Sequence, residues 1–216
     1  MKKKLAACAM ALTMAFAGAG LPAEVFQGVF GRSTMVAEAV KSADGKYNYS
    51  VNSDGTAKIT AFLEDSATLT YPATVDGYTI SGMSPAVSLK IFSPALSSGK
   101  ATTIIFADGV TAIPSQAFMD ITSITSVQIP SSVTSIGAGA LKGTGLYNNQ
   151  SGIKYAGSWV IGSDTTVTSV SVNSGTIGLA DSAFSGCTSL TSVTIPDGIQ
   201  YIGKRVFGGC TQSGSA

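Results

Sequence analysis

The chain has 216 residues, of which 12% are charged, with 13 basic residues, 12 acidic residues and no histidine. This length suits one domain or a short repeat array. The low charge argues against a disordered tail and against a nucleic-acid partner, because nucleic-acid binding relies on clustered basic residues. The lack of histidine excludes Ser-His-Asp and Cys-His catalytic sites and imidazole zinc sites. We expect no enzyme, no cofactor and no metal, and an enzyme that works through serine or carboxylate alone is the least favoured alternative.

The amino terminus has the residue order of a secretory signal peptide. Lys2–Lys4 precede the apolar run Leu5–Phe16, and small residues follow it. We expect export with removal of residues 1–23. Cleavage after Ala19 and cleavage as late as Ala39 also fit the small-residue pattern.

A retained membrane anchor is less favoured than cleavage, because the apolar run is rich in alanine and is followed by Pro22. Removing the signal leaves 10 basic and 12 acidic residues, a net charge of about −2. Cys8 leaves with the signal, so only Cys187 and Cys210 remain. We expect a secreted or cell-surface protein in which residues 24–45 are a linker.

A motif of about 23 residues recurs along the chain, a period typical of stacked repeats. The segment Val193–Phe207 aligns with Val170–Phe184, and the same apolar pattern begins earlier at Val127, at Ile104 and, in degenerate form, at Leu69. Each copy predicts two short strands and a tight closing turn. One copy cannot fold alone, because five buried side chains provide roughly 10 kcal/mol, less than the cost of ordering the backbone. The repeats must therefore stack, with strands about 4.8 Å apart and one continuous core.

About 20 extra residues interrupt the period near residues 143–162, between the equivalent positions Ile129 and Val172. Within this insertion, Ile153–Tyr155 and Trp159–Ile161 flank a short turn. They predict a β-hairpin that projects from the stack.

Upstream of the repeats, Tyr47–Val51 and Thr56–Phe62 read as two alternating strands joined by a turn. We expect residues 46–64 to form a hairpin cap on the first edge of the core. Ser93–Lys100 is expected to be a loose polar connection before the first regular repeat. Residues 65–210 then form the solenoid.

The repeat segments resemble the BspA-type leucine-rich repeat of bacterial surface proteins. The resemblance is carried by the Ile-Pro step in Leu190–Ile199, by Ile202-Gly203, and by the closures Ala183–Cys187 and Phe207–Cys210. It covers about residues 65–210, and it departs from the Phe and Cys positions at Phe118 with Ile121 and at Leu141 with Thr144. It implies a leucine-rich-repeat-like solenoid in a secreted or surface-exposed adhesion module that binds proteins or host matrix, and it implies no catalytic residues.

Residues between the apolar strand positions should face outward in two rows. One row contains Ile105, Gln128, Ser171 and Thr194, and the other contains Thr103, Ser126, Ser169 and Ser192. Such rows are either a docking surface for a protein or glycan or the ordinary outer face of a soluble sheet. Tyr147, Tyr155 and Trp159 cluster in the insertion, where they either anchor a partner or pack back onto the stack.

Cys187 and Cys210 occupy the same position in successive repeats, so their Cα atoms should lie about 5 Å apart. That separation permits a disulfide. Side chains in a parallel ladder are often poorly oriented for the bond, so we favour two buried free thiols.

Glu64 and Asp65 point to opposite faces of an extended chain and cannot form an acid/base pair. Asn52–Gly55 is expected to be a plain turn, because it lacks the later ligands of a calcium loop.

The sequence therefore favours a non-catalytic binding or adhesion module that recognises a protein or glycan on a host or neighbouring cell surface. A structural spacer or envelope-assembly piece without a specific ligand is the alternative. No cap is recognisable after the last strand, Val193–Ile195, or in the tail at residues 211–216. We expect self-association at this C-terminal edge unless further repeats or a partner cover it.

Overall fold

A computed structural model describes residues 39–211, which contain short strands and three short helices. The predicted signal peptide, most of the predicted linker and residues 212–216 lie outside the described residues. Among the residues that are described, no helix is long and apolar enough to cross a membrane.

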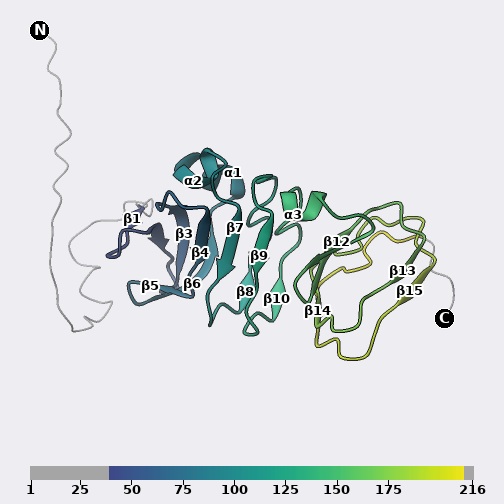
Figure 1. Ribbon diagram of the computed structural model, residues 1–216. Coiled ribbons are helices and arrows are strands. Elements are labelled where there is room, and N and C mark those ends of the chain that lie inside the picture. The colour runs from purple at the N-terminus through teal and green to yellow at the C-terminus, as the bar shows by residue number, and fades with distance from the viewer. Residues whose placement is uncertain (1–38, 212–216) are drawn as a thin grey trace, which may run out of the picture. The chain divides into compact units, whose positions relative to one another are not determined.

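The first sheet has five strands in the order β1–β2–β3–β6–β5 (Figure 1). It begins with an antiparallel hairpin, because Tyr47, Tyr49 and Ile59 alternate with less buried residues and turn toward the core. Strand β3 then pairs in parallel with β6, so the hairpin belongs to a sheet that reaches Met83. The strands are β1 (Val40–Lys41), β2 (Tyr47–Val51), β3 (Ala57–Phe62), β5 (Thr74–Val75) and β6 (Tyr78–Met83).

Two parallel sheets form the first part of the solenoid. They are β4–β7–β9 and β8–β10, with β4 (Thr68–Tyr71), β7 (Thr103–Phe106), β9 (Ser126–Gln128), β8 (Ala112–Ile113) and β10 (Ser135–Ile136). Ile104 pairs with Val127, and Ile113 pairs with Ile136, so both registers advance by one repeat period. The step from β4 to β7 is longer, with Leu69 paired to Ile104.

Two helices account for that longer step. They are α1 (Ala86–Phe92) and α2 (Pro94–Ser97). Ser93 joins them and is fully buried, and its hydroxyl accepts a hydrogen bond of 2.8 Å from the Phe62 N–H. Leu89 and Leu96 are also buried in the core. The expected loose polar connection at Ser93–Lys100 is therefore wrong, since its polar appearance hid buried apolar positions on two short helices.

The insertion contains α3 (Gly145–Asn148), β11 (Ile153–Ala156) and β12 (Trp159–Ser163). Strands β11 and β12 pair as an antiparallel hairpin, but β12 also pairs in parallel with β14 (Gly178–Leu179). The prediction that this hairpin projects from the stack is wrong. Four successive residues of β12, Trp159 to Gly162, are buried, which makes it an internal strand of the sheet.

The last part of the solenoid repeats the two-sheet arrangement. Strand β13 (Ser169–Ser171) pairs with β15 (Ser192–Thr194), and β14 pairs with β16 (Tyr201–Ile202). Both pairs are parallel, and both registers again advance by one repeat period, as Val170 with Val193 and Leu179 with Ile202 show.

The buried apolar residues form two clusters rather than the single continuous core expected from the period. The first cluster extends from the cap to Trp159, Ile161 and Ala180. The second contains Val160 and Leu179 together with the interior of the last repeats. Because side chains alternate along a strand, β12 contributes to the first cluster from one face and to the second from the other. The insertion therefore divides the core in two.

We predict that Phe184→Ala destabilises the fold by roughly 3 to 5 kcal/mol, the usual cost of removing a buried aromatic side chain. Phe184 is 0% exposed and stacks on Phe207 with ring centroids 5.4 Å apart. Thr194→Ala should change stability little, because Thr194 is exposed. Denaturant titration measures both, and equal small effects would contradict the assigned repeat positions.

Candidate functional site

Most residues of the predicted polar rows are exposed on their strands, but the rows are divided between two sheets. Ser126 and Gln128 are exposed on β9, where they pair with the half-buried Thr103 and Ile105 of β7. The four remaining residues are exposed on β13 and β15: Ser169, Ser171, Ser192 and Thr194. Strands β9 and β13 belong to different sheets, because the insertion lies between them in the chain. The expected continuous rows are therefore two separate short ones.

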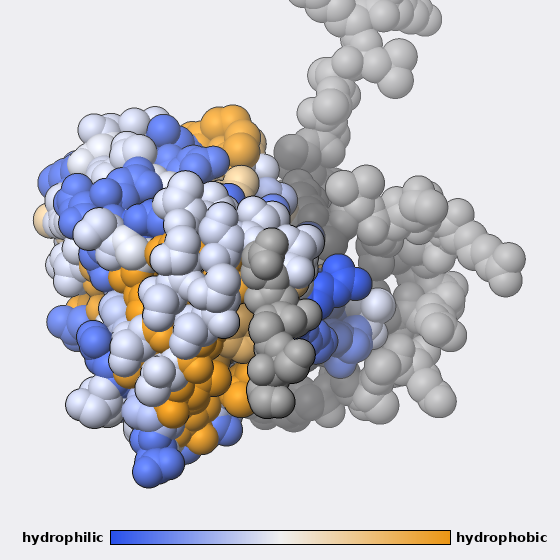
Figure 2. All heavy atoms as spheres, turned by 90° about the vertical axis from the view of Figure 1, so that its right-hand side faces the viewer, coloured by the Kyte–Doolittle hydropathy of each residue, from blue (hydrophilic) through white to orange (hydrophobic). Residues whose placement is uncertain are grey.

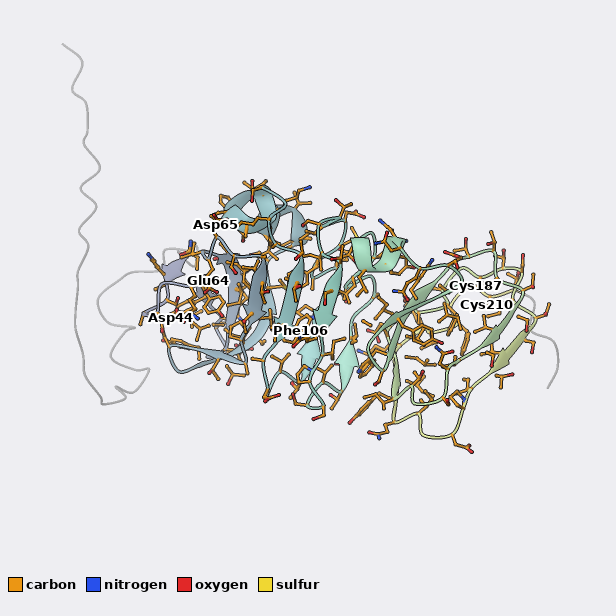
Figure 3. All side chains as sticks on the ribbon, viewed as in Figure 1. Asp44, Glu64, Asp65, Phe106, Cys187 and Cys210 are labelled. Carbon is orange, nitrogen blue, oxygen red and sulfur yellow. The ribbon has the colours of Figure 1, made fainter. Side chains whose placement is uncertain are left out.

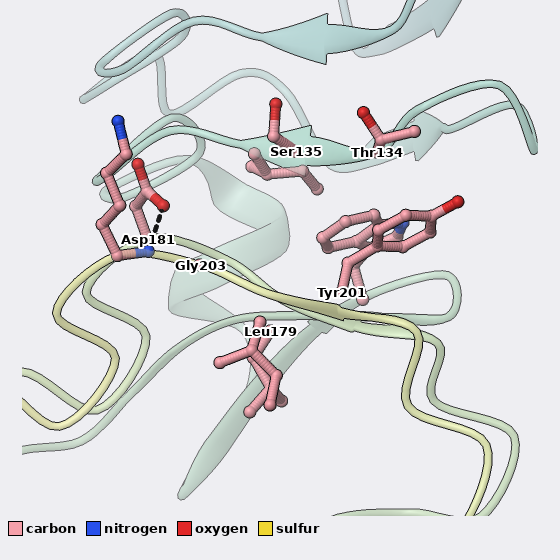
Figure 4. A pocket seen from close by; sticks show the side chains of 10 residues that line it. Thr134, Ser135, Leu179, Asp181, Tyr201 and Gly203 are labelled. Atoms are coloured by element: carbon pink, nitrogen blue, oxygen red, sulfur yellow. Dashed lines mark hydrogen bonds between the residues drawn. The ribbon is translucent and has the colours of Figure 1, made fainter.

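The three aromatic residues of the insertion pack inward to different degrees. Trp159 is only 2% exposed, so it cannot serve as a surface anchor. Its indole ring stacks on Tyr201 with centroids 5.6 Å apart and an angle of 7° between the planes. Gly178 makes this stack possible, since a Cβ atom there would collide with the indole. The stack borders a small pocket of about 140 Å³, which Tyr201 and Leu179 help to line. Tyr201 and Leu179 project from opposite sides of the neighbouring strands β16 and β14 (Figure 4).

Tyr155 and Tyr147 are half-buried and bonded to the surrounding backbone. The Tyr155 hydroxyl accepts a hydrogen bond of 3.0 Å from the Asn173 N–H. The Tyr147 hydroxyl donates to the Ser163 carbonyl oxygen at 3.3 Å, and burial raises the pKa of this phenol. Of the three aromatic residues, only Tyr147 borders a larger cavity.

That cavity, which we call the junction groove, has a volume of about 500 Å³. It lies where the insertion separates the first repeats from the last ones. One wall comes from the earlier repeats, the floor from the insertion, and the other wall from the turn after β14. The first wall is lined by Gln116, Met119, Gly139 and Lys142. The floor is lined by Tyr147, Ser163 and Asp164, and the second wall by Asp181, Ser182 and Ser185.

The closing turns of neighbouring repeats are joined by backbone hydrogen bonds on either side of this groove. In the earlier repeats, three backbone N–H groups donate to carbonyl oxygens of the next turn at N···O distances of 2.8 to 3.0 Å. The pairs are Gln116 with Ala138, Phe118 with Ala140 and Asp120 with Lys142. In the later repeats the same bonds run at 2.8 to 2.9 Å: Ser182 to Lys204, Phe184 to Val206 and Gly186 to Gly208. We call these bonds the turn ladder.

The turn ladder is broken at the junction groove. In a continuous stack, the backbone N–H groups of the turn at residues 139–143 would donate to the carbonyl oxygens of Asp181, Ala183 and Ser185. Within the described residues no such bonds form. The Ala183 carbonyl oxygen instead accepts a hydrogen bond of 3.2 Å from the Ser163 hydroxyl. The carbonyl oxygens of Asp181 and Ser185 accept no hydrogen bond from any described residue.

One repeat position beside the groove has a left-handed backbone. Its residues are Gln116, Gly139, Ser182 and Arg205, with φ of 56°, 65°, 60° and 51°. Glycine adopts this conformation readily, whereas other residues are strained in it by about 1 kcal/mol or more. Gln116, Gly139 and Ser182 all border the junction groove. Residue type alone does not mark these four residues as candidate site residues; their recurrence at the same place in each repeat is the available signal.

The floor of the groove carries a paired charge. The Lys154 ammonium lies 2.8 Å from Asp164, contacts the Gln150 carbonyl oxygen, and sits 5.6 Å from the centre of the Tyr147 ring. The Lys154 side chain is only 5% exposed, whereas that of Asp164 is 43% exposed. The hydrogen bond from Lys154 lowers the pKa of the Asp164 carboxyl.

The two cysteines are free thiols on successive turns near the carboxyl end of the described residues (Figure 3). Cys187 is buried with its sulfur 3.2 Å from the Ser163 hydroxyl. Cys210 donates to the Phe184 carbonyl oxygen at 3.2 Å, and burial raises the pKa of its thiol. A raised pKa disfavours the reactive thiolate.

The neighbouring acidic residues Glu64 and Asp65 form ion pairs with different lysines. Glu64 lies 3.6 Å from Lys46, and Asp65 lies 2.9 Å from Lys100. Asp54 accepts hydrogen bonds from Thr56 across the turn that joins β2 and β3. In residues 39–211 no cluster of three or more His, Cys, Asp or Glu side chains could hold a metal ion.

Two parallel strands per turn, paired at a register step of one repeat period both before and after the insertion and packed around apolar interiors, define a solenoid of the leucine-rich-repeat class. The model of the BspA-type leucine-rich repeat region matches six copies over residues 89–214. The chain therefore belongs to the BspA-type leucine-rich repeat family. This agrees with the resemblance seen in the sequence, where four regular copies and one degenerate copy were recognised.

Solved structures of leucine-rich repeat proteins are also similar to the chain. A leucine-rich cell surface protein of Faecalibacterium prausnitzii is 25% identical over 80% of this chain and 47% of its own, with a TM-score of 0.42. A leucine-rich repeat protein of T. pallidum is 18% identical over 80% of this chain and 90% of its own, also with a TM-score of 0.42. The chain thus spans about half the length of the F. prausnitzii protein. No curated protein matches it.

We predict that Asp164→Asn lowers the melting temperature at neutral pH, because it leaves the buried Lys154 ammonium without its counter-charge. The folded-state pKa of Asp164 is depressed, so its contribution is present above the ordinary carboxyl pKa and is lost as pH falls through the folded value. The difference in melting temperature between wild type and variant should therefore shrink as the pH falls below the ordinary carboxyl pKa and through the depressed folded-state value. Thermal melts at several pH values measure this, and a pH-independent difference would contradict it.

Proposed function

We propose that the chain is a non-catalytic binding or adhesion module, exported to the cell surface or secreted, that holds a protein or glycan through its exposed repeat strands. The observation that carries this proposal is the placement of short polar side chains in register on parallel strands, on β9 and on the β13–β15 pair. These side chains are exposed and make no contribution to either buried cluster.

Membership of the BspA-type family supports the proposal. The separate pairing of Glu64 and Asp65 supports a non-catalytic role, since neither is available as a partner for the other. A spacer without a ligand would place no demand on the identity of the exposed strand residues, so substitution there separates the two functions.

We predict that Gln128→Ala weakens ligand binding by the polar residues of β9, and that Thr194→Ala weakens ligand binding by those of β13 and β15. The two substitutions are made in separate variants because these residues lie on different sheets. The mature protein would be screened against surface proteins, matrix proteins and glycans. Ser131→Ala, in an exposed turn, is the matched control and should bind as wild type does. Unchanged binding by both strand variants, with unchanged circular dichroism, would place the ligand elsewhere.

The last described turn carries exposed apolar side chains, which favours a second copy of the chain as a partner. Ile195, Ile202 and Phe207 are 41%, 66% and 38% exposed, and β15 and β16 are edge strands among those described. An apolar strip crosses the molecular face at this end (Figure 2). Exposed edges and apolar strips favour association.

We predict that self-association at this edge depends on concentration and is reduced by Ile202→Lys, which puts a charge on the edge strand. Val87→Lys is the control, because Val87 is equally apolar and 72% exposed on α1. Sedimentation velocity over a concentration series gives the oligomeric state. A strictly monomeric wild-type protein at high concentration would contradict this proposal.

A further inference from the structure

The break in the turn ladder leaves backbone groups of opposite kinds on the two sides of the junction groove. On the first side, the N–H groups of Gly139, Leu141 and Gly143 stand where a continuous stack has its donors, and they donate to no described residue. On the second side, the carbonyl oxygens of Asp181 and Ser185 receive no hydrogen bond within residues 39–211. Gly139, Asp181 and Ser185 line the groove itself. A ligand between the walls must therefore accept hydrogen bonds on one side and donate them on the other.

The side chains extend this division between donors and acceptors. On the first wall, the exposed Lys142 ammonium can only donate, and it forms no ion pair with an acid in the described part of the chain. On the second wall, the Asp181 carboxylate can only accept, and one of its oxygens receives a hydrogen bond of 2.6 Å from the Lys204 N–H. The first wall therefore mainly offers donors, and the second mainly offers acceptors.

The second wall is not a strand edge that a peptide could extend. Ser182 and Gly186 have φ of 60° and 79°, so the backbone curls into a tight turn. The Ala183 carbonyl oxygen, which lies between the two open acceptors in the chain, already accepts a hydrogen bond from the Ser163 hydroxyl. The ligand must therefore reach separate acceptors with groups that point in different directions.

The charges in the groove favour a ligand without net charge. Lys142 contributes a positive charge on one wall and Asp181 a negative charge on the other. On the floor, the carboxylate of Asp164 is paired with Lys154 at 2.8 Å. An acidic ligand would meet the carboxylates, and a basic one would meet the Lys142 ammonium.

Hydroxyl groups meet both hydrogen-bonding requirements, because each of them donates one hydrogen bond and accepts others. A sugar carries several hydroxyls in different directions on one uncharged ring. Met119 and the half-buried Tyr147 supply apolar surface for the C–H groups of such a ring. The volume of about 500 Å³ is within the range of small-molecule sites.

We propose that the junction groove binds a neutral saccharide. Its hydroxyl groups accept hydrogen bonds from the Gly139 N–H and the Lys142 ammonium, and they donate to the carbonyl oxygens of Asp181 and Ser185. This inference rests on the proposed binding function, but it assigns a ligand class to a surface other than the polar strand rows.

The first test screens the wild-type mature protein against an array of neutral and acidic saccharides. Isothermal titration calorimetry then measures the affinity of the best neutral one for Gly139→Gln, which fills the groove and should lower affinity at least tenfold. Gln116 occupies the equivalent left-handed position, and a Cβ atom at residue 139 meets its neighbours at ordinary distances of 3.9 to 4.0 Å, so this variant should fold. Arg205→Gln, at the same repeat position outside the groove, should bind as wild type does. Melting temperatures check folding.

The second test removes the charged donor of the first wall. Lys142→Met keeps the aliphatic stem and should lower affinity for the same saccharide at least threefold, because a ligand hydroxyl loses its donor. Lys58→Met is the matched control, since Lys58 is equally exposed but lies on β3, in the first sheet. It should bind as wild type does.

The third test changes the saccharide, so it does not depend on the folding of a variant. Each hydroxyl is replaced in turn by hydrogen or by a methoxy group. At one hydroxyl or more, both replacements should lower affinity at least tenfold, because a methoxy group still accepts but no longer donates to the carbonyl oxygens.

Three results would each overturn the proposal: no neutral saccharide bound by the wild-type protein, equal affinity of Gly139→Gln or Lys142→Met and wild type, or tolerance of replacement at every hydroxyl. The first of these would leave the groove to water or, if acidic saccharides alone bind, to a charged ligand. Saccharide binding that is lost in Gln128→Ala or Thr194→Ala but unchanged in Gly139→Gln would keep the proposed function and reject the groove as its site.

Discussion

The arrangement of the repeats depends on one strand that is buried on both faces. Trp159 and Ile161 of β12 pack into the first apolar cluster, and Val160 between them packs into the second. Parallel pairing of β12 with β14 fixes the last repeats to this strand, and Gly178 provides the space for the indole. The two cores, the separation of β9 from β13 and the break in the turn ladder all follow from this double burial.

The recurrence of apolar residues predicted the repeats well, because a buried position must be apolar in each turn of a stack. The pairs Ile104 with Val127 and Val170 with Val193 lie in register as that spacing requires. Family membership could also be inferred from local segments such as Ala183–Cys187, since they close a turn on buried side chains. These features depend on neighbouring residues and on a fixed period.

The position of the inserted hairpin could not be predicted in the same way, because it depends on which strand β12 pairs with. Two short apolar segments around a turn indicate a hairpin, but they do not indicate whether it projects or joins a sheet. The continuous apolar run at Trp159–Ile161 is nevertheless typical of a strand buried on both faces, whereas a projecting hairpin would alternate. The junction groove could not be predicted from the sequence for a related reason, because its walls come from residues far apart in the chain, such as Gln116 and Ser182.

The position of Trp159 also gives the protein an internal spectroscopic reporter. It is the only tryptophan in the chain, and it lies where the two apolar clusters meet. Its intrinsic fluorescence therefore senses the seam between the first and last repeats, whereas circular dichroism averages over all strands. If the last repeats loosen before the first ones, tryptophan emission should change ahead of the loss of strand signal, and the two halves of this short solenoid could be followed as separate cooperative units in one unlabelled sample.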